Sequence, residues 1–266
     1  MKRWEIIVAI CSILLFGFLF SRDLLARFAW QKYHSPATAL VFASQDTKLL
    51  MQLGNYYFNG GAYDLARAKR AYEKALRVDP KILWGHYQLG RIYFVEGKFD
   101  LALEEINKEL EANPENLRSL YVRGLIYGYR GQAGDLAKAE EDFQKFTTWA
   151  PMEWAGYNDL SWILSKEGKY REAGEAAQRG IEISSGGSEN PWLWNSLGVA
   201  FLNLGKISEA KAAFERAFQY AGKLDPAEWR SAYPGNNPFS LESGYNEFLN
   251  AIRQNISKTE RVDNSL

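Results

Sequence analysis

The stretch Leu53-Gly54-Asn55-Tyr56-Tyr57 decides how this chain folds, because its pattern of a leucine, a small residue and an aromatic three positions later returns along the sequence. It recurs as Leu89-Gly90-Arg91-Ile92-Tyr93 and, with replacements, at residues 123–127, 160–164 and 197–201. The small residues at positions 54, 90, 124, 161 and 198 are separated by 36, 34, 37 and 37 positions. A period of this length predicts a repeat architecture in which each unit packs on the next.

A second pattern follows each occurrence of the first. It places an alanine four positions before another apolar residue, as in Ala68-x-x-x-Tyr72, Ala102-x-x-x-Ile106, Ala139-x-x-x-Phe143, Ala173-x-x-x-Ala177 and Ala210-x-x-x-Phe214. Apolar positions three and four apart predict helices, so each unit is interpreted as two helices of about a dozen residues. The small residue and the alanine let the two helices approach closely. Prolines then close three of the units, at positions 80, 114 and 151.

The two patterns in phase resemble the tetratricopeptide repeat (TPR), whose unit has about 34 residues. The resemblance covers residues 46–222 and implies an all-α, right-handed superhelical solenoid of about five helical hairpins. We place the repeats at about 46–80, 81–114, 115–151, 152–187 and 188–222. A loop and an amphipathic capping helix, from about Pro238 to Gln254, are expected within residues 223–256, because a terminal repeat exposes an apolar face. Residues 257–266 are expected to be disordered.

The N-terminal segment, residues 1–21, is predicted to be a transmembrane anchor. Lys2 and Arg3 precede an unbroken apolar run from Ile6 to Phe20. A helix of this length, about 22 Å, approaches the hydrocarbon core of about 30 Å once residues 4–21 are counted. A cleaved signal peptide has the same layout, but no small-x-small pair follows the run, which favours an uncleaved anchor.

The distribution of charge and the residues after the apolar run indicate the orientation of the anchor in the membrane and the structure of the connector. Basic residues flank the apolar run almost equally on both sides, so the positive-inside rule is nearly tied. A short N-terminal tail normally stays in the cytoplasm, which would place the repeats on the extracytoplasmic side. Residues 22–45 are expected to form a partly helical connector. A helix over Ala37–Ser44 would cover the first repeat.

Composition and motifs argue against several classes of function. Lysine plus arginine and aspartate plus glutamate both total 32, and this zero net charge lacks the basic excess of a nucleic-acid binder. Neither of the two histidines, His34 and His86, has a second histidine or a cysteine at ligand spacing. No phosphate-binding loop or nucleophile elbow is present. Acidic runs on the predicted helices are interpreted as solvated faces: Glu104, Glu105 and Glu109, and Glu140, Glu141 and Asp142. The sequence therefore predicts no catalytic residue, no metal and no cofactor, and the chain is not expected to be an enzyme.

The TPR resemblance implies that the first helix of each repeat lines a concave groove that holds a ligand. Carried over to this sequence, it gives a candidate groove of aromatic, amide and guanidinium side chains: Trp84, Tyr87, Arg91, Arg118, Tyr121, Asn158, Trp162, Trp192 and Asn195. Such side chains suit the backbone and side chains of an extended peptide. The alternative is that these aromatic residues pack between repeats.

These features together predict a membrane-anchored adaptor that binds a protein or peptide in its groove. Two alternatives remain open at this stage: a secreted or surface glycan-binding module, and a non-catalytic accessory subunit of an envelope enzyme complex. The lysine with which chaperone-binding TPR proteins hold a terminal carboxylate is replaced by Met51, so we do not expect chaperone binding. The sequence does not indicate whether the chain self-associates.

Overall fold

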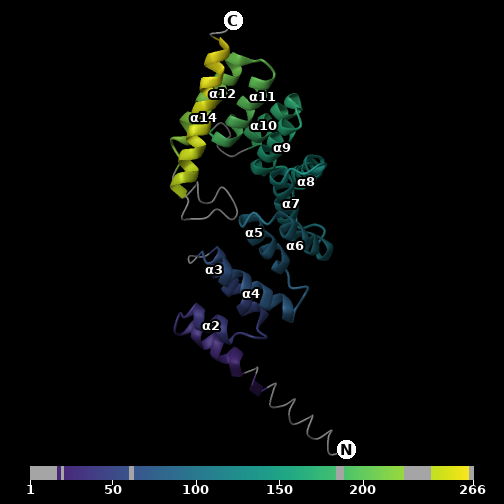
Figure 1. Ribbon diagram of the computed structural model, residues 1–266, viewed down its shortest axis with the longest axis vertical. Helices are drawn as coiled ribbons and strands as arrows, with labels where there is room; N and C mark the ends of the chain where they lie inside the picture. The colour runs from purple at the N-terminus through teal and green to yellow at the C-terminus, as the bar shows by residue number, and fades with distance from the viewer. Residues whose placement is uncertain (1–16, 19–20, 60–62, 184–188, 225–240, 264–266) are drawn as a thin grey trace, which may run out of the picture. The chain divides into compact units, whose positions relative to one another are not determined.

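A computed structural model describes residues 17–18, 21–59, 63–183, 189–224 and 241–263 of the 266-residue chain (Figure 1). Within these ranges the regular structure is entirely α-helical. The chain divides into two compact units, Met1–Glu96 with Glu104–Ala112, and Gly97–Leu103 with Asn113–Leu266. Each unit is a stack of antiparallel helical hairpins, which confirms the predicted all-α, TPR-like solenoid.

The first unit contains a helical segment over residues 21–31 and four further helices with part of a fifth. Their bounds are α2 (Pro36–Phe42), α3 (Thr47–Phe58), α4 (Leu65–Val78), α5 (Gly85–Val95) and, from Glu104 onward, α6 (Phe99–Ala112). Aspartate side chains start two of these helices: Asp46 accepts from the Leu49 amide and Asp64 accepts from the Arg67 amide. These bonds satisfy amide groups that a helix N-terminus leaves without a backbone partner.

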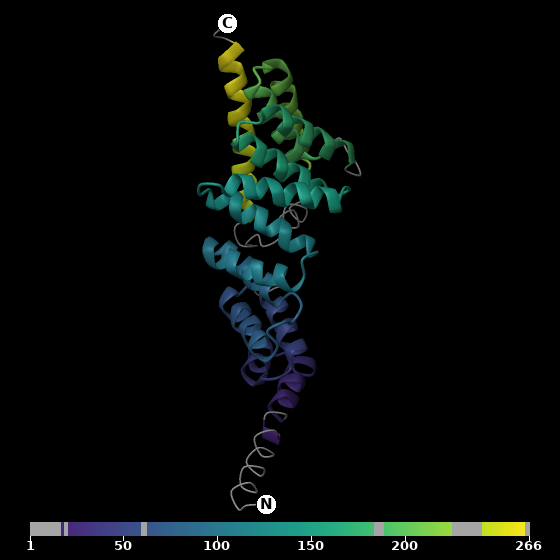
Figure 2. The ribbon, with the colours of Figure 1, turned by 90° about the vertical axis from the view of Figure 1, so that its right-hand side faces the viewer.

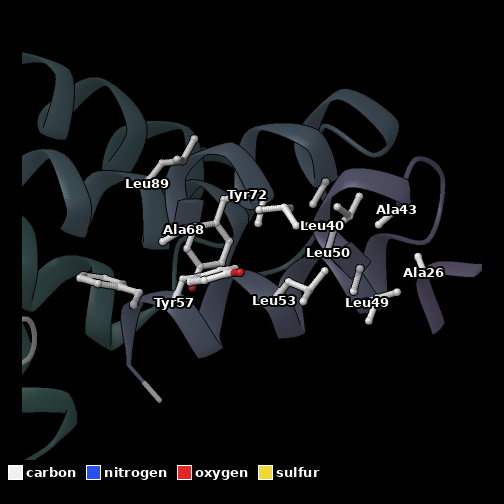
Figure 3. Close-up of a cluster of buried hydrophobic side chains, with 14 of the residues drawn as sticks. Ala26, Leu40, Ala43, Leu49, Leu50, Leu53, Tyr57, Ala68, Tyr72 and Leu89 are labelled. Atoms are coloured by element: carbon white, nitrogen blue, oxygen red, sulfur yellow. The ribbon is translucent and has the colours of Figure 1, made fainter. Parts of the chain in front are cut away.

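The core of the first unit is built around the small residue of the repeat pattern. Gly54 lies directly against the ring of Tyr72, so a Cβ at this position would clash with that ring. Tyr72 is fully buried, and its hydroxyl donates to Asn55 Oδ1 at 2.8 Å. Figure 3 shows this cluster, in which side chains from the segment 21–31, α3, α4 and α5 meet. The close approach of the paired helices is the one expected from the sequence pattern.

The connector is part of this core. Ala26 and Ala29 are buried in it, and both carboxylate oxygens of Asp23 accept from the backbone amide of Gln45. Lys74 of α4 donates to the carbonyl oxygens of Leu40 and Ala43 at 2.7 and 2.9 Å. The end of α2 is thereby attached to the first hairpin. The helix expected over Ala37–Ser44 is present as α2, and residues 21–31 form a second helix that covers the same hairpin.

The predicted membrane location is corrected. The segment on which it rested, residues 4–21, lies almost wholly outside the described residues. Among the residues that are described, no helix combines the length and the apolar character needed to cross a bilayer. The prediction of a single-pass protein with its repeats on the extracytoplasmic side is contradicted by this finding. The helix that follows, residues 21–31, carries buried Asp23 and packs on the repeats through Ala26 and Ala29.

The second unit contains three hairpins and a long C-terminal helix. The hairpins are α7 (Leu117–Arg130) with α8 (Asp135–Trp149), α9 (Trp154–Lys166) with α10 (Tyr170–Ile183), and α11 (Pro191–Asn203) with α12 (Ile207–Ala221). As expected, Asn190 and Pro191 start α11, and the Asn190 side chain accepts from the amides of Trp192 and Leu193. The small-residue contact recurs, since a Cβ on Gly198 would come within 2.6 Å of the Phe214 ring.

The C-terminal helix α14 (Leu241–Asp263) packs along α12, as both views in Figures 1 and 2 show. Its Ile252 is fully buried among alanines of α12, so the expected capping role is present. The helix is longer than expected: it continues past Gln254 to Asp263, through most of the segment that we expected to be disordered. Ile256 packs on the same core and Thr259 is fully buried, which explains the continuation. The exact repeat boundaries stay a prediction.

Candidate partner-binding site

A pocket of about 200 Å³ lies in the second unit between the first helices of its three hairpins and α14. It brings together four of the predicted groove residues, Asn158, Trp162, Trp192 and Asn195. Its other lining residues come from α7, α9, α11 and α14, and they are Leu125, Tyr129, Asp159, Ser196 and Phe248. First helices of successive repeats therefore meet at one site, as the repeat pattern implied.

The walls of the pocket are aromatic. The rings of Trp162 and Tyr129 lie 5.0 Å apart, and the Trp192 ring is stacked on Phe248 of α14 at 5.8 Å. Trp162 reaches this position because Gly128 has no side chain: a Cβ there would lie 2.6 Å from its ring. Lys166 lies over the Trp162 ring, 4.5 Å from its centre, and donates to the Gly128 carbonyl oxygen at 2.7 Å. Aromatic surface is thus held in place from four helices, α7, α9, α11 and α14.

Polar side chains line the pocket between these walls. The Asn158 side chain donates to Asp159 Oδ1 and accepts from the Ser196 hydroxyl, both at 3.0 Å. The Tyr121 hydroxyl donates to Asp159 Oδ2 at 2.5 Å. Asn195 accepts from the Asn255 amide of α14 at 3.2 Å, which ties the capping helix to the site. Each amide therefore has a fixed orientation.

Asp159 is a buried carboxyl, only 4% exposed. Burial raises its pKa to about 6, although the hydrogen bonds from Tyr121 and Asn158 favour the ionised form and act in the opposite direction. Among the described residues no lysine or arginine contributes to this pKa. The carboxyl is stabilised by neutral donors alone.

The predicted groove residues of the first unit have a different environment. Tyr87 and Arg91 are 4% and 7% exposed, so they are packed within the unit. Arg91 donates to Asn59 and Gln88 at 3.2 and 2.9 Å. The backbone amides of Trp84 and Tyr87 both donate to the buried Glu109 carboxylate at 3.1 Å.

Two other predicted residues and two acidic side chains complete this account. Arg118, in the second unit, is exposed and does not line the pocket, and Tyr121 reaches it only through Asp159. The interpretation of the acidic runs as solvated faces was wrong for two residues: Glu109 caps α5, and Asp142 is buried against Arg123 at 2.7 Å. A carboxylate can be buried where a backbone amide or a guanidinium donates a hydrogen bond to it. The positions of charged residues along one helix do not show whether such a donor lies nearby.

The sequence analysis missed Asp159, Tyr129 and Phe248 as parts of a site. Asp159 carries a usable signal, because it is an acid on the first helix of a repeat directly after a predicted groove residue. Phe248 was assigned only to the apolar stripe of the capping helix. Its position at the pocket depends on the path of α14, which crosses from α12 to α11.

Comparisons with known proteins agree with this fold. Family models described as tetratricopeptide repeat match residues 51–116, 87–127 and 193–223. The BBSome complex member BBS4 of Bos taurus is 26% identical over 189 residues, which are 71% of this chain and 34% of that protein, so the chain spans about a third of its length.

Solved structures show the same architecture. The crystal structure of MamA has a TM-score of 0.56 at 22% identity, covering 66% of this chain and 92% of MamA. YrrB, described as a TPR protein with an unusual peptide-binding site, has a TM-score of 0.56 at 19% identity, covering 70% of this chain and 92% of YrrB. The matched segments and the stacked hairpins agree in showing that this chain contains tetratricopeptide repeats.

Proposed function

We propose that this chain is a scaffold or adaptor that binds a polypeptide partner at the pocket between α7, α9, α11 and α14, without catalysis of its own. The observation that carries the proposal is the grouping of aromatic faces and oriented amides from four helices. Tyr129 is 53% exposed, and Trp162 is partly exposed beside it. Aromatic residues in a concave site, flanked by a few fixed polar groups, are typical of surfaces that hold side chains of a partner.

The comparisons with known proteins also support a binding role. YrrB is described as having a peptide-binding site and BBS4 as a member of a complex. Those descriptions belong to the other proteins, but they are consistent with a binding role for the repeats here.

The proposed site leaves out part of the predicted groove. Trp84, Tyr87 and Arg91 interact within the first unit, and Arg118 lies outside the pocket. We therefore restrict the site to residues of the second unit. The self-association of the chain is a separate question.

Site-directed photo-crosslinking tests the proposal. A photoreactive phenylalanine analogue replaces Tyr129 at the pocket or, as the matched control, Tyr33 of the first unit, which is 65% exposed. We expect position 129 to crosslink a discrete polypeptide and position 33 not to do so. The crosslink should disappear when Trp162→Ala is added, while the circular dichroism of the protein is unchanged.

Glycan binding is the competing outcome. If tryptophan fluorescence shifts on titration with oligosaccharides, and position 129 crosslinks no polypeptide, the adaptor proposal is wrong and the glycan-binding alternative gains support. A crosslink that persists in the Trp162→Ala protein would place the partner elsewhere on the chain.

A further inference from the structure

Asp159 differs from the other buried aspartates of the second unit. Asp135 and Asp142 are 1% and 3% exposed, and each meets a guanidinium: Arg130 at 2.8 Å and Arg123 at 2.7 Å. Asp159 is similarly buried, yet within the described part of the chain it accepts only from the neutral side chains of Tyr121 and Asn158. A buried carboxylate is normally compensated by a cation, because ionisation away from water is otherwise costly.

From this contrast we infer that the pocket receives a lysine or arginine side chain of the polypeptide partner, with Asp159 as its carboxylate acceptor and the partly exposed Trp162 as its aromatic wall. The inference rests on the proposed function, since it names the partner's chemistry at the same pocket. The cation that the described residues do not supply to Asp159 would come from the ligand.

The aromatic wall of the pocket favours a cation, in addition to the carboxylate of Asp159. A guanidinium or ammonium group over an indole face is attracted by the negative electrostatic potential of the ring, and tryptophan gives the strongest such contact. Trp162 already makes one contact of this kind, with Lys166. Lys166 is directed to the Gly128 carbonyl, and within the described residues no ion pair joins it to Asp159.

The size of the pocket fits one side chain. A water molecule occupies about 30 Å³ of liquid, so a volume of about 200 Å³ corresponds to several waters. That space admits the end of a long side chain. Asn195 and Ser196 line the same pocket. Their polar side chains could accept those N–H groups of the partner's lysine or arginine that do not reach Asp159.

Selection from a random peptide library tests the inference. A displayed library of 12-residue peptides is selected against the full chain and, in parallel, against Asp159→Asn and Glu153→Gln. The matched control Glu153 is an exposed acid at the start of the same helix, outside the pocket. Against the wild type and Glu153→Gln we expect one position of the selected peptides to be lysine or arginine. Against Asp159→Asn this preference should be lost.

The affinity of one selected peptide gives the quantitative test. Replacing its preferred arginine by glutamine, or its lysine by norleucine, should weaken binding to the wild type at least about tenfold, as expected for a hydrogen-bonded charge. The same replacement should change binding to Asp159→Asn less than about twofold. This pattern of coupling assigns the contact to Asp159.

The two proposals fail in distinguishable ways. If no peptide is selected against any protein, the adaptor proposal itself is contradicted. If peptides are selected without a basic position, or bind both proteins equally after their charge is removed, polypeptide binding stands and the cationic specificity is wrong. Because the peptide replacements are measured on the wild type, the test remains decisive even if Asp159→Asn does not fold.

Discussion

Arg91 in the first unit and Trp162 in the second occupy the same place in the repeat, directly after the small residue, and they have opposite roles. Arg91 lies over the Phe58 ring at 4.6 Å and donates to Gln88, three positions before it. Asp159 stands three positions before Trp162, and its acceptor oxygens receive no cation from the described residues. The comparison teaches that the same repeat position can hold a cation of the protein in one repeat and an aromatic ring beside a carboxylate without a cation from the described residues in another.

The strongest test converts the second arrangement into the first. Trp162→Arg places a guanidinium three residues after Asp159, where it can reach the carboxylate from within the same helix. We expect the affinity for a selected basic peptide to fall about a hundredfold, or about 2.7 kcal/mol, because an internal cation competes with the ligand and an aromatic wall is lost. Titration measures this effect. Trp162→Phe, which keeps an aromatic ring, should bind within about fivefold of the wild type, and equal losses in both variants would contradict the comparison.

The reverse test concerns Arg91. Arg91→Leu removes two hydrogen bonds and the contact with Phe58, so the free energy of unfolding should fall by about 2–3 kcal/mol. Urea denaturation followed by circular dichroism measures the loss. Arg77→Gln, which removes an exposed guanidinium from α4, should change stability by less than about 0.5 kcal/mol. If Arg91→Leu instead kept its stability and lost peptide binding, Arg91 would belong to the site after all.

The burial of Asp159 predicts a pH effect on stability. Its pKa in the folded chain, about 6, lies above the ordinary value of 3.8, so the unfolded chain releases this proton at lower pH. Ionisation therefore destabilises the fold as pH rises from 4, and the full cost is present above pH 6. Acidification from pH 7 to pH 4 should remove about 2 kcal/mol of this cost in the wild type and none in Asp159→Asn. The measurement is the difference between the two unfolding curves at each pH, and parallel pH profiles would be inconsistent with a buried ionised Asp159.

Ligand binding should have the opposite pH dependence. The titratable groups that face Asp159 are Tyr121 and Tyr129 of α7, while the pocket residues of α11 and α14 are uncharged. A basic peptide needs the ionised carboxylate, so its affinity should fall about tenfold, or about 1.4 kcal/mol, between pH 7 and pH 5. Asp159→Asn should show no such fall. If the affinity of the wild type for the peptide did not change with pH, the peptide would not bind the Asp159 carboxylate.

Several parts of the site follow from the repeat pattern, and others do not. The TPR resemblance implied that Asn158, Trp162 and Asn195 line a groove on the first helices of the repeats, with Trp192 at its edge. The structure brings them to one pocket. Tyr87 and Arg91 lie outside this pocket and are buried in the first unit. The repeat pattern alone does not distinguish a face that lines a cavity from one that neighbouring side chains fill. It also gave no reason to expect Phe248, which comes from outside the repeats.

The sequence by itself determined the helical hairpins and their stacking, because spacing and small residues are local properties that a period repeats. Gly54 against Tyr72 and Gly198 against Phe214 show that rule in both units. Only the tertiary structure decided which acids are paired with cations, how far α14 continues and where a pocket remains. These features depend on side chains that are far apart in the chain. The pairing of a buried charge and the volume of a cavity are determined by all the side chains around it, and no single stretch of sequence contains them all.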